Sequence, residues 1–363
     1  MKKFFALTLV LIICLTLFGC GTSEPAADNS ELESSKLESS LPSSEPVSSE
    51  PVSSEPVESE PEPAPTDVVA RVAALKGPTA MGLVQLMDAE DPQFEFTIAA
   101  AADEITPQLV QGNLDIAAVP ANLASVLYNN TEGQIQVLAV NTLGVLYLAE
   151  KGDTVHSVED LRGRTIYSSG KGSTPEYALN YLLSQNGIDP ESDVTIEWKS
   201  EHSECVAALA AGENAIAMLP QPFLTTAQTK DDSIRVALDL NEEWEKLSST
   251  SENAATLITG VVVARKAFVE ENPETVKDFL EKYEASVNYV NSNVDEAAAL
   301  VGKFDIVPEA VAKQALPKCN ITFIAGQEMK EKLSAYLQTL FEQNPKAIGG
   351  AMPDDDFFYS YAG

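Results

Sequence analysis

His202 and Cys205 form the residue pair whose types and spacing favour covalent chemistry. Side chains three positions apart meet on one face of a helix, where an imidazole can activate a thiol as a nucleophile. The helical pattern begins only at Glu204, however, and no third side chain is evident to orient the imidazole. We therefore expect His202 to be a surface or capping residue, and we do not expect an enzyme.

His156 is the only other histidine, and it lies far from His202 in the sequence. It precedes a helix-like segment, so a surface or capping position is expected for it too. Neither histidine has the spacing of a metal site, and the sequence indicates no metal and no cofactor.

Two glycine-containing loops indicate the binding of a solute instead. The first loop reads Lys76-Gly77-Pro78-Thr79 and the second reads Lys171-Gly172-Ser173-Thr174. Each loop follows a strand-like run and precedes a helical pattern, so its backbone N–H groups lie at the positive end of a helix. Such an end suits carboxylates, sulfonates, phosphates and other hydrogen-bond acceptors. Proline, serine and threonine are also ordinary helix starters, so plain capping stays the alternative.

Other loops that follow strand-like runs supply further candidate ligand contacts. They contain Pro120 and Asn122 after one strand and Gln221 after another, and Thr142 and Thr256 flank the runs expected to connect the two halves of the fold. For each of these residues, a turn or cap is about as well supported as a ligand contact.

The elements that position these loops alternate between apolar, β-rich runs and segments of helical spacing, which is typical of sheets covered by helices. In the first series, strands are expected at 68–75, 94–100, 114–119 and 135–140, and helices at 78–88, 105–111 and 121–128. In the second, strands are expected at 165–168, 194–198, 215–219 and 234–238, and helices at 174–185, 204–211 and 222–229. After a strand at 257–264 the rest is expected to be helical, at 273–290, 295–301, 309–316 and 327–341.

Two series of similar size and a helical tail predict an α/β protein of two lobes, each a sheet flanked by helices. Lobe one is expected to comprise residues 67–142 and 257–363, and lobe two residues 143–256. Strands at 143–149 and 257–264 are expected to cross between them, and their interior glycines, Gly144 and Gly260, indicate bending or close backbone approach. If the lobes face each other, the two glycine loops form opposite jaws, because ligands bind beyond the carboxyl ends of the strands.

The first residues have the pattern of an export signal. The chain begins with Met-Lys-Lys, an apolar run follows at 4–18, and residues 17–20 read LFGC. The run is too short to span a bilayer comfortably. LFGC resembles the bacterial lipobox, which implies removal of residues 1–19 and attachment of lipid to Cys20. An ordinary signal with an incidental cysteine is the alternative.

Residues 20–66 are rich in serine, glutamate and proline, and SSEPV occurs at 43–47, 48–52 and 53–57. Such a segment cannot bury enough apolar surface to offset its ordering entropy, so a disordered tether is expected. The net charge of the chain is −32, which argues against nucleic acid and against a polybasic membrane patch. Beyond the signal and Cys20, only Cys205 and Cys319 remain, as one disulfide or, by the favoured interpretation, as two buried free thiols.

Four stretches carry a family resemblance: 112–117 (GNLDIA), 157–164 (SVEDLRGR), 172–175 (GSTP) and 268–273 (FVEENP). They resemble the solute-binding proteins of ABC importers, in particular the group that handles nitrate, sulfonates such as taurine, and thiamine pyrimidine precursors. The resemblance covers about residues 67–345. It implies a type 2 periplasmic-binding fold that closes on its solute like a hinged clamp and docks on a permease.

The chain also departs from this group. The loop comparable to the Gly-Glu-Phe-Gly signature of pyrimidine-precursor binders reads SGKGS at 169–173, and the cysteine-rich metal motif of the pyrimidine synthase relatives is not seen. Both observations argue against a thiamine-precursor ligand. Few aromatic residues fall on the candidate loops, so a sugar stacked between rings is not expected.

These features predict an extracytoplasmic solute-binding lipoprotein of an ABC importer, anchored in the cell membrane through Cys20. We expect a monomer that clamps a small polar or anionic solute between its lobes and delivers it to a permease. A ligand-sensing lipoprotein stays open as an alternative, and an extracytoplasmic enzyme on the same fold is less favoured. The sequence names neither the solute nor the permease.

Overall fold

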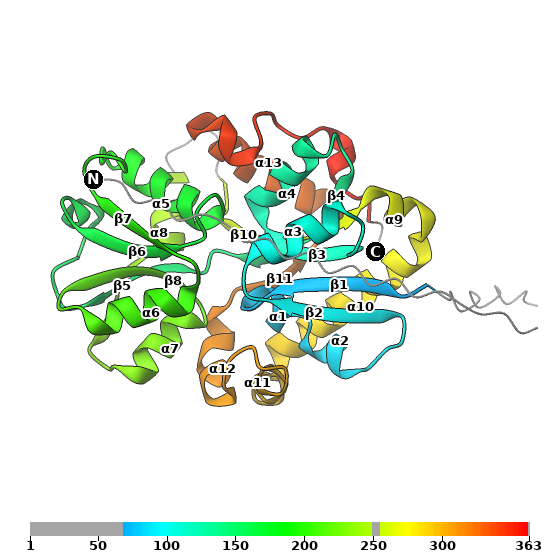
Figure 1. Ribbon diagram of the computed structural model, residues 1–363, viewed down its shortest axis with the longest axis horizontal. Coiled ribbons are helices and arrows are strands. Elements are labelled where there is room, and N and C mark those ends of the chain that lie inside the picture. Colours follow the sequence, from blue (N-terminus) through cyan, green and yellow to red (C-terminus); the bar gives the residue numbers. More distant parts are fainter. Residues whose placement is uncertain (1–67, 249–254, 362–363) are drawn as a thin grey trace, which may run out of the picture. The chain divides into compact units, whose positions relative to one another are not determined.

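The structure is a computed structural model, and it describes residues 68–248 and 255–361. The predicted signal, Cys20 and the predicted tether lie outside the described residues. In the described part, alternating strands and helices build two sheets with helices on their faces (Figure 1). The predicted α/β architecture is confirmed, whereas the residue boundaries of the two lobes stay a prediction.

The first sheet has six strands in the order β11-β4-β10-β3-β1-β2. Their bounds are β1 Ala70–Leu75, β2 Phe94–Ala99, β3 Ile116–Pro120, β4 Ile135–Leu143, β10 Ile258–Arg265 and β11 Ile321–Ile324. Strand β1 pairs in parallel with β2 and β3, while β10 runs antiparallel to β3 and β4. The carboxyl ends of β1, β2 and β3 therefore meet at one edge of this sheet.

The second sheet has five strands in the order β7-β6-β8-β5-β9. Their bounds are β5 Leu146–Lys151, β6 Thr165–Ser169, β7 Thr195–Lys199, β8 Ala215–Pro220 and β9 Ile234–Asp239. Strand β6 pairs in parallel with β7 and β8, and β5 runs antiparallel to β8 and β9. The carboxyl ends of β6, β7 and β8 likewise share one edge.

Helices follow most strands, as the pattern predicts. Those in the segments of the first sheet are α1 Pro78–Met81, α2 Val84–Asp88, α3 Ala102–Val110, α4 Ala121–Asn130, α9 Lys266–Glu271, α10 Pro273–Ser292, α11 Val294–Lys303, α12 Glu309–Ala315 and α13 Gly326–Gln343. Those in the segment of the second sheet are α5 Thr174–Gln185, α6 His202–Ala211, α7 Phe223–Lys230 and α8 Leu240–Ser248. Short 3₁₀ turns lie at Val158–Leu161, Leu316–Lys318, Pro345–Ile348 and Asp355–Phe357.

An aromatic cluster joins α13 to the helices of the second sheet. The rings of Tyr336 in α13 and Trp244 in α8 lie 5.7 Å apart, and Trp244 lies 4.4 Å from Tyr181 in α5. All three side chains are buried. Helix α13 therefore packs on both halves of the fold, although it follows the last strand of the first sheet.

Several details of the predicted elements are wrong. The helix expected at 78–88 is broken into α1 and α2 at Gly82 and Leu83. Gly82 is closely packed, since a Cβ atom there would come 3.1 Å from Ile321 and 3.3 Å from the Tyr283 hydroxyl. The crossing strand expected at 143–149 is interrupted between β4 and β5. The crossing strand expected at 257–264 matches β10, which lies wholly in the first sheet. The C-terminal region expected to be helical also contains the strand β11. Helices α8 and α9 were not predicted.

The expected close approach at the two interior glycines is confirmed. A Cβ atom on Gly144 would lie 2.2 Å from Asn241 Oδ1, and one on Gly260 would lie 2.5 Å from Asn141 Oδ1. Neither position accepts a larger residue unless its neighbour moves. Gly260 also faces a register shift between β10 and β4, so the ladder bends there.

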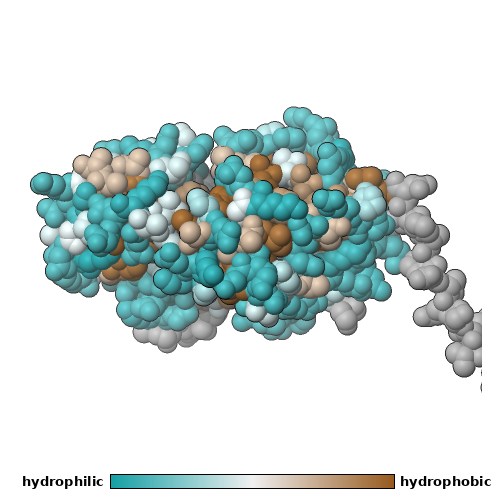
Figure 2. Space-filling model, turned by 90° about the horizontal axis from the view of Figure 1, so that it is seen from below, coloured by the Kyte–Doolittle hydropathy of each residue, from teal (hydrophilic) through white to brown (hydrophobic). Residues whose placement is uncertain are grey.

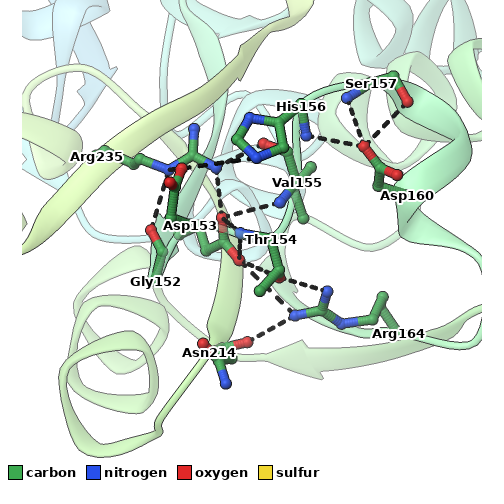
Figure 3. A network of polar contacts seen from close by, with 11 residues as sticks. Gly152, Asp153, Thr154, Val155, His156, Ser157, Asp160, Arg164, Asn214 and Arg235 are labelled. Carbon is green, nitrogen blue, oxygen red and sulfur yellow. Dashed lines mark hydrogen bonds and ion pairs between the residues drawn. The ribbon is translucent and has the colours of Figure 1, made fainter.

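A buried carboxylate holds each sheet together. Asp115 precedes β3 and binds the guanidinium groups of Arg71 in β1 and Arg265 in β10. Glu150 in β5 binds Arg235 in β9 and the loop that follows β5. Figure 3 shows how Arg235 and the residues of this loop, Gly152 to Val155, lie together. Asp115 of the GNLDIA stretch (112–117) thus has a structural role. In the SVEDLRGR stretch (157–164), Ser157 forms a capping box with Asp160.

The face of the molecule drawn in Figure 2 is mainly hydrophilic. On the face drawn in Figure 2, hydrophobic residues form small separate patches and no continuous apolar area. Within residues 68–248 and 255–361, no helix has the length and apolar character that a membrane span requires.

Candidate functional site

A cavity of about 160 Å³ lies where the strand ends of the two sheets meet. Its walls come from the loops after β1, β2 and β3 on one side and after β6, β7 and β8 on the other. The chain segment that leads from the end of β4 into β5 forms a further part of the wall, through Thr142, Val145 and Leu146. This is the position at which open α/β sheets bind ligands.

Nine of the thirteen predicted ligand contacts line this cavity. They are Lys76, Gly77, Pro78, Thr79, Pro120, Thr142, Ser173, Thr174 and Gln221. The other four, Asn122, Lys171, Gly172 and Thr256, lie outside its lining. The structure thus brings the two glycine loops to one place, and the role of these residues in binding stays a prediction.

The four predicted contacts outside the lining lie elsewhere in the structure. Asn122 is buried at the start of α4, where its amide donates to the carbonyl oxygens of Ala347 (2.9 Å) and Gly172 (3.4 Å). Lys171 and Gly172 are exposed, and Thr256 is half-buried ahead of β10. Asn122 therefore ties the first-sheet side of the cavity to the second glycine loop.

The wall on the first-sheet side differs from the predicted helix N-terminus. Because α1 spans only Pro78–Met81, it supplies little helix dipole, whereas the longer α3 begins beside the cavity at Ala102. Glu104 already accepts hydrogen bonds from the backbone N–H groups of Ala100 and Ala101. Lys76 is the basic side chain at this wall, and its amine lies 3.7 Å from the carboxylate of Asp305.

Five hydroxyl groups that line the cavity direct their protons into the protein. Thr79 donates to the Leu75 carbonyl (2.7 Å), Thr142 to Asn141 Oδ1 (3.1 Å), Ser173 to the Gly170 carbonyl (2.8 Å), Thr174 to Asn122 Oδ1 (3.2 Å) and Thr259 to the Leu143 carbonyl (2.6 Å). Each hydroxyl therefore offers a ligand its lone pairs first. Rotating a proton toward a ligand oxygen would break a bond inside the protein.

Gln221 presents the opposite chemistry. Its Oε1 accepts hydrogen bonds from the backbone N–H and the hydroxyl of Thr225, one turn into α7. These two bonds fix the orientation of the amide and leave its NH₂ group for the cavity that Gln221 lines. The predicted ligand contact at this position is thus a neutral hydrogen-bond donor.

His202 was not predicted as a cavity residue, and its expected place before the helix is wrong. It is the first residue of α6, it is half-buried, and it lines the cavity beside Phe223, whose ring lies 4.9 Å away. Its Nδ1 lies 2.6 Å from the Ser169 hydroxyl oxygen. Burial among protein atoms lowers the pKa of His202 to about 4. Its position after β7 is the signal that could have found it, since the other cavity loops also follow strands.

Cys205 does not pair with His202 as a nucleophile. Its side chain is fully buried, and burial raises the pKa of the thiol to about 11, whereas an activated cysteine has a lowered pKa. Ser169 is the group that contacts both side chains. Cys205 and Cys319 are free, buried thiols, and the described residues contain no cluster of His, Cys, Asp and Glu that could hold a metal ion.

Residues 84–307 match the family described as "ABC transporter, phosphonate, periplasmic substrate-binding protein". The chain belongs to this family. A curated relative is YtlA of Bacillus subtilis (strain 168), whose name proposes a binding role; it is 21% identical over 258 residues, which cover 68% of this chain and 73% of YtlA.

Solved structures of binding proteins share the fold of this family member. An ABC transporter protein from Parabacteroides distasonis has a TM-score of 0.67 at 23% identity, over 82% of this chain and all of that one. The aliphatic sulphonate binding protein SsuA from Escherichia coli has a TM-score of 0.63 at 17% identity, over 82% of this chain and 95% of SsuA. The expected periplasmic-binding fold and the expected group of ABC solute-binding proteins are therefore confirmed.

Proposed function

We propose that this protein is the lipid-anchored, extracytoplasmic receptor of an ABC importer, which clamps a small polar or anionic solute between its two sheets and delivers it to a membrane permease. Its family supports the transport role. The observation that carries the proposal is a cavity to which the strand ends of both sheets contribute. A ligand held there contacts both halves of the fold, which is the condition for closure around it.

The size and lining of the cavity favour a small solute with an oxygen-bearing head group. A cavity of roughly 150 Å³ holds a molecule as small as benzene, and the present one has about 160 Å³. The amide of Gln221 lies on one side, where α5 and α6 also begin, and a helix N-terminus favours hydrogen-bond acceptors. Apolar residues such as Leu75, Val145 and Phe223 line other parts of the wall and suit a short carbon substituent.

Thermal denaturation with a ligand panel tests solute capture. The panel contains methylphosphonate, methanesulfonate, nitrate and acetate as anions and methylammonium as a cation. A ligand present at 100 times its dissociation constant stabilises the folded state by about 2.7 kcal/mol, which raises the melting temperature measurably. If none of the anions raises it, the capture of small anions by this cavity is disproved.

A cavity-filling variant shows whether the panel ligand binds at this site. Ala101→Phe places a ring into the cavity that Ala101 lines, and should abolish the ligand-dependent stabilisation. Ala89→Phe is the matched control, because Ala89 is exposed at the end of α2 and does not line the cavity. Equal ligand stabilisation in both variants would place the ligand elsewhere.

The anchor and the transport step need separate tests. Cys20→Ser should release the protein from the membrane fraction and stop the incorporation of a labelled fatty acid, with Cys14→Ser, inside the predicted signal, as the control. A permease encoded next to this chain, reconstituted in vesicles, should hydrolyse ATP faster when the loaded protein is added. An unchanged rate would favour the ligand-sensing role instead.

A further inference from the structure

The chain that follows α13 packs against the first-sheet side of the fold as a C-terminal strap, which we define as residues 345–361 (Figure 1). Its Phe357 ring is fully buried and lies edge to face on Tyr128 of α4, with the ring centroids 5.1 Å apart. The strap also forms a parallel bridge to β4. It is therefore a packed part of the molecule, although it lies beyond residues 84–307, which match the family.

Three polar side chains on one face of α4 hold the backbone of the strap. Each donates to carbonyl oxygens at 2.8 to 2.9 Å, and the pairs are Asn122 with Ala347, Ser125 with Ile348, and Asn129 with Ile348 and Ala351. A spacing of three and four positions places the three donors in one row along the helix. The strap is thus fixed to α4 through its main chain.

Asn122 differs from the other two donors because it also reaches the second glycine loop. Its amide nitrogen faces the Gly172 carbonyl at 3.4 Å, and its Oδ1 accepts a hydrogen bond from the Thr174 hydroxyl at 3.2 Å. Asn122 is fully buried, and Thr174 lines the cavity. Only this orientation of the amide serves both carbonyl acceptors and the hydroxyl donor. One side chain therefore joins the strap, α4 and the loop.

The second glycine loop is intrinsically flexible and depends on such support. Gly170 and Gly172 have φ angles of +78° and +79°, and glycine loses more conformational freedom on ordering than any other residue. Helix α13, from which the strap continues, contacts the loop as well, because its buried Tyr336 hydroxyl lies beside Thr174. The C-terminal part of the chain thus holds the loop at two neighbouring points.

We propose that the C-terminal strap sets the affinity for the solute through Asn122: the strap holds the Asn122 amide, and Asn122 holds the second glycine loop in the conformation that completes the cavity. This inference rests on the proposed function of solute capture. Asn122 does not line the cavity, so it is a positioning residue. A loop that is ordered before the solute arrives costs less entropy on binding.

Hydrogen exchange of the full-length protein, followed by mass spectrometry, tests the link without a ligand. In Asn122→Ala, the backbone N–H groups of residues 170–174 should exchange at least about fivefold faster, because the loop opens more often. Ser125→Ala is the matched control, since it removes a bond of equal length to the strap one turn farther along α4. Unchanged exchange in Asn122→Ala, or equal acceleration in both variants, would overturn the proposal.

A second pair of variants displaces the strap and leaves Asn122 in place. A Cβ atom on Gly349 would come 3.0 Å from the Val126 Cα and the Asn129 Cβ, so Gly349→Leu should push the strap away from α4. Gly350→Leu is the control: its φ of +98° is as strained for leucine as the +89° of Gly349, but its Cβ would have no atom of the described chain within 4 Å. Faster exchange of residues 170–174 is expected in Gly349→Leu alone, and equal exchange in the two variants would contradict the role of the strap.

Calorimetric titration with methanesulfonate and methylphosphonate tests the consequence for binding. Asn122→Ala and Gly349→Leu should each weaken binding of the better probe about tenfold, whereas Ser125→Ala and Gly350→Leu should change it less than about twofold. The melting temperature of each unliganded variant checks that it is folded.

The outcomes of this titration separate the two proposals. If the wild type binds a probe and both Asn122→Ala and Gly349→Leu bind it equally well, the control of affinity by the strap is wrong while solute capture stands. If the wild type binds neither probe, the proposed capture of small oxyanions is itself contradicted, and the control of affinity falls with it.

Discussion

The two sheets each contain a buried carboxylate at the end that faces away from the cavity, and they neutralise it differently. Strand β3 begins one residue after Asp115 and reaches the cavity at Pro120. Strand β5 begins at the cavity with Leu146 and reaches Glu150 near its other end. The exposed fraction of the carboxylate side chain is 3% for Asp115 and 0% for Glu150.

In the first sheet, arginines provide most of the neutralisation. Arg71 binds Asp115 through Nε and Nη2, each at 2.8 Å, and Arg265 adds a bond of 2.6 Å from its Nη2. The Arg71 backbone N–H adds one more, at 3.0 Å. Since β1, β3 and β10 are neighbours in the sheet, this carboxylate clamps three strands side by side.

In the second sheet, the backbone takes a larger share. Glu150 accepts hydrogen bonds from the N–H groups of Thr154 (3.0 Å) and Val155 (3.1 Å) and from the Thr154 hydroxyl. Arg235 is its close cation, at 2.7 Å, and Arg164 lies farther away, at 3.8 Å (Figure 3). This carboxylate folds the loop after β5 against β9.

The difference between the two clusters shows which carboxylate must carry its charge for its sheet to be stable. A neutral amide can still accept from backbone N–H groups, but it cannot balance two guanidinium groups. The first sheet should therefore depend on the charge of Asp115 more than the second depends on the charge of Glu150.

The largest expected effect is on the free energy of unfolding. Asp115→Asn should lower it by about 3 kcal/mol, and Glu150→Gln by about 2 kcal/mol, values at the low end for broken buried pairs. The low values follow because solvent screens the arginine partners, whose side chains are 39% (Arg71), 25% (Arg265) and 30% (Arg235) exposed. Urea unfolding measures the free energy of unfolding of each variant and shows which substitution lowers it more.

The control for this comparison is Asp103→Asn. Asp103 is exposed in the first turn of α3, so its loss of charge should change stability by less than about 0.5 kcal/mol. A cost for Glu150→Gln that equals or exceeds the cost for Asp115→Asn would refute the distinction between the two sheets.

A second prediction concerns how the stabilisation by the same two carboxylates depends on pH. Burial alone raises the pKa of Asp115 and of Glu150, but hydrogen bonds outweigh it, from Arg71 and Arg265 in one case and from Thr154 and Val155 in the other. Both pKa values are therefore lower in the folded state than in the unfolded state. Their stabilisation is fully present above the unfolded pKa of about 4 and is lost as the pH falls through the folded pKa.

The measurement compares wild type with Asp115→Asn at pH 6 and at pH 3. Because the variant has no charge to lose at this position, the stability difference between the two proteins should shrink at the lower pH. A difference that stays constant would show that Asp115 titrates alike in both states, and a difference that grows would contradict the sign of its pKa shift.

The sequence predicts the fold well because its main signals are local. Alternating apolar runs and helical spacing place nearly every strand of both sheets, and the glycine loops at Lys76 and Lys171 fall where strands end. The short strand β11 could not be predicted in this way, because its four residues, beside a long helical region, are too few to show the apolar pattern of a strand.

The polar clusters could not be predicted, because their partners are distant in the sequence. The strand expected at 143–149 stops short of Glu150, and Arg235, the partner of Glu150, lies 85 positions away in the sequence. Ser169 and His202 are separated by 33 positions, and no local pattern indicates that they meet. Strand ends indicate which loops converge, but they do not indicate which side chains pair there.

A smaller effect is expected from the Thr154 hydroxyl, which links the second carboxylate to Arg164. It donates to Glu150 and accepts from Arg164 Nη1 at 2.7 Å. Thr154→Val removes both bonds while it keeps the shape of the side chain, and should lower the free energy of unfolding by about 1 kcal/mol. Thr165→Val, an exposed change at the start of β6, is the control. A loss as large as that of Glu150→Gln would mean that the hydroxyl, and not the backbone, carries the second cluster.

The smallest expected effect is on ligand affinity, and it separates the two ends of each sheet. Asp115 lies five residues from Pro120 at the cavity, a distance of about 16 Å along an extended strand. A neutral residue there removes a charge whose field is already balanced by Arg71 and Arg265. Asp115→Asn and Glu150→Gln should therefore change the dissociation constant of a cavity ligand less than about twofold, as measured by calorimetric titration under conditions where each variant is folded. A tenfold change in either variant would show that the far ends of the sheets set the geometry of the cavity, and the division between a structural end and a binding end would then be wrong.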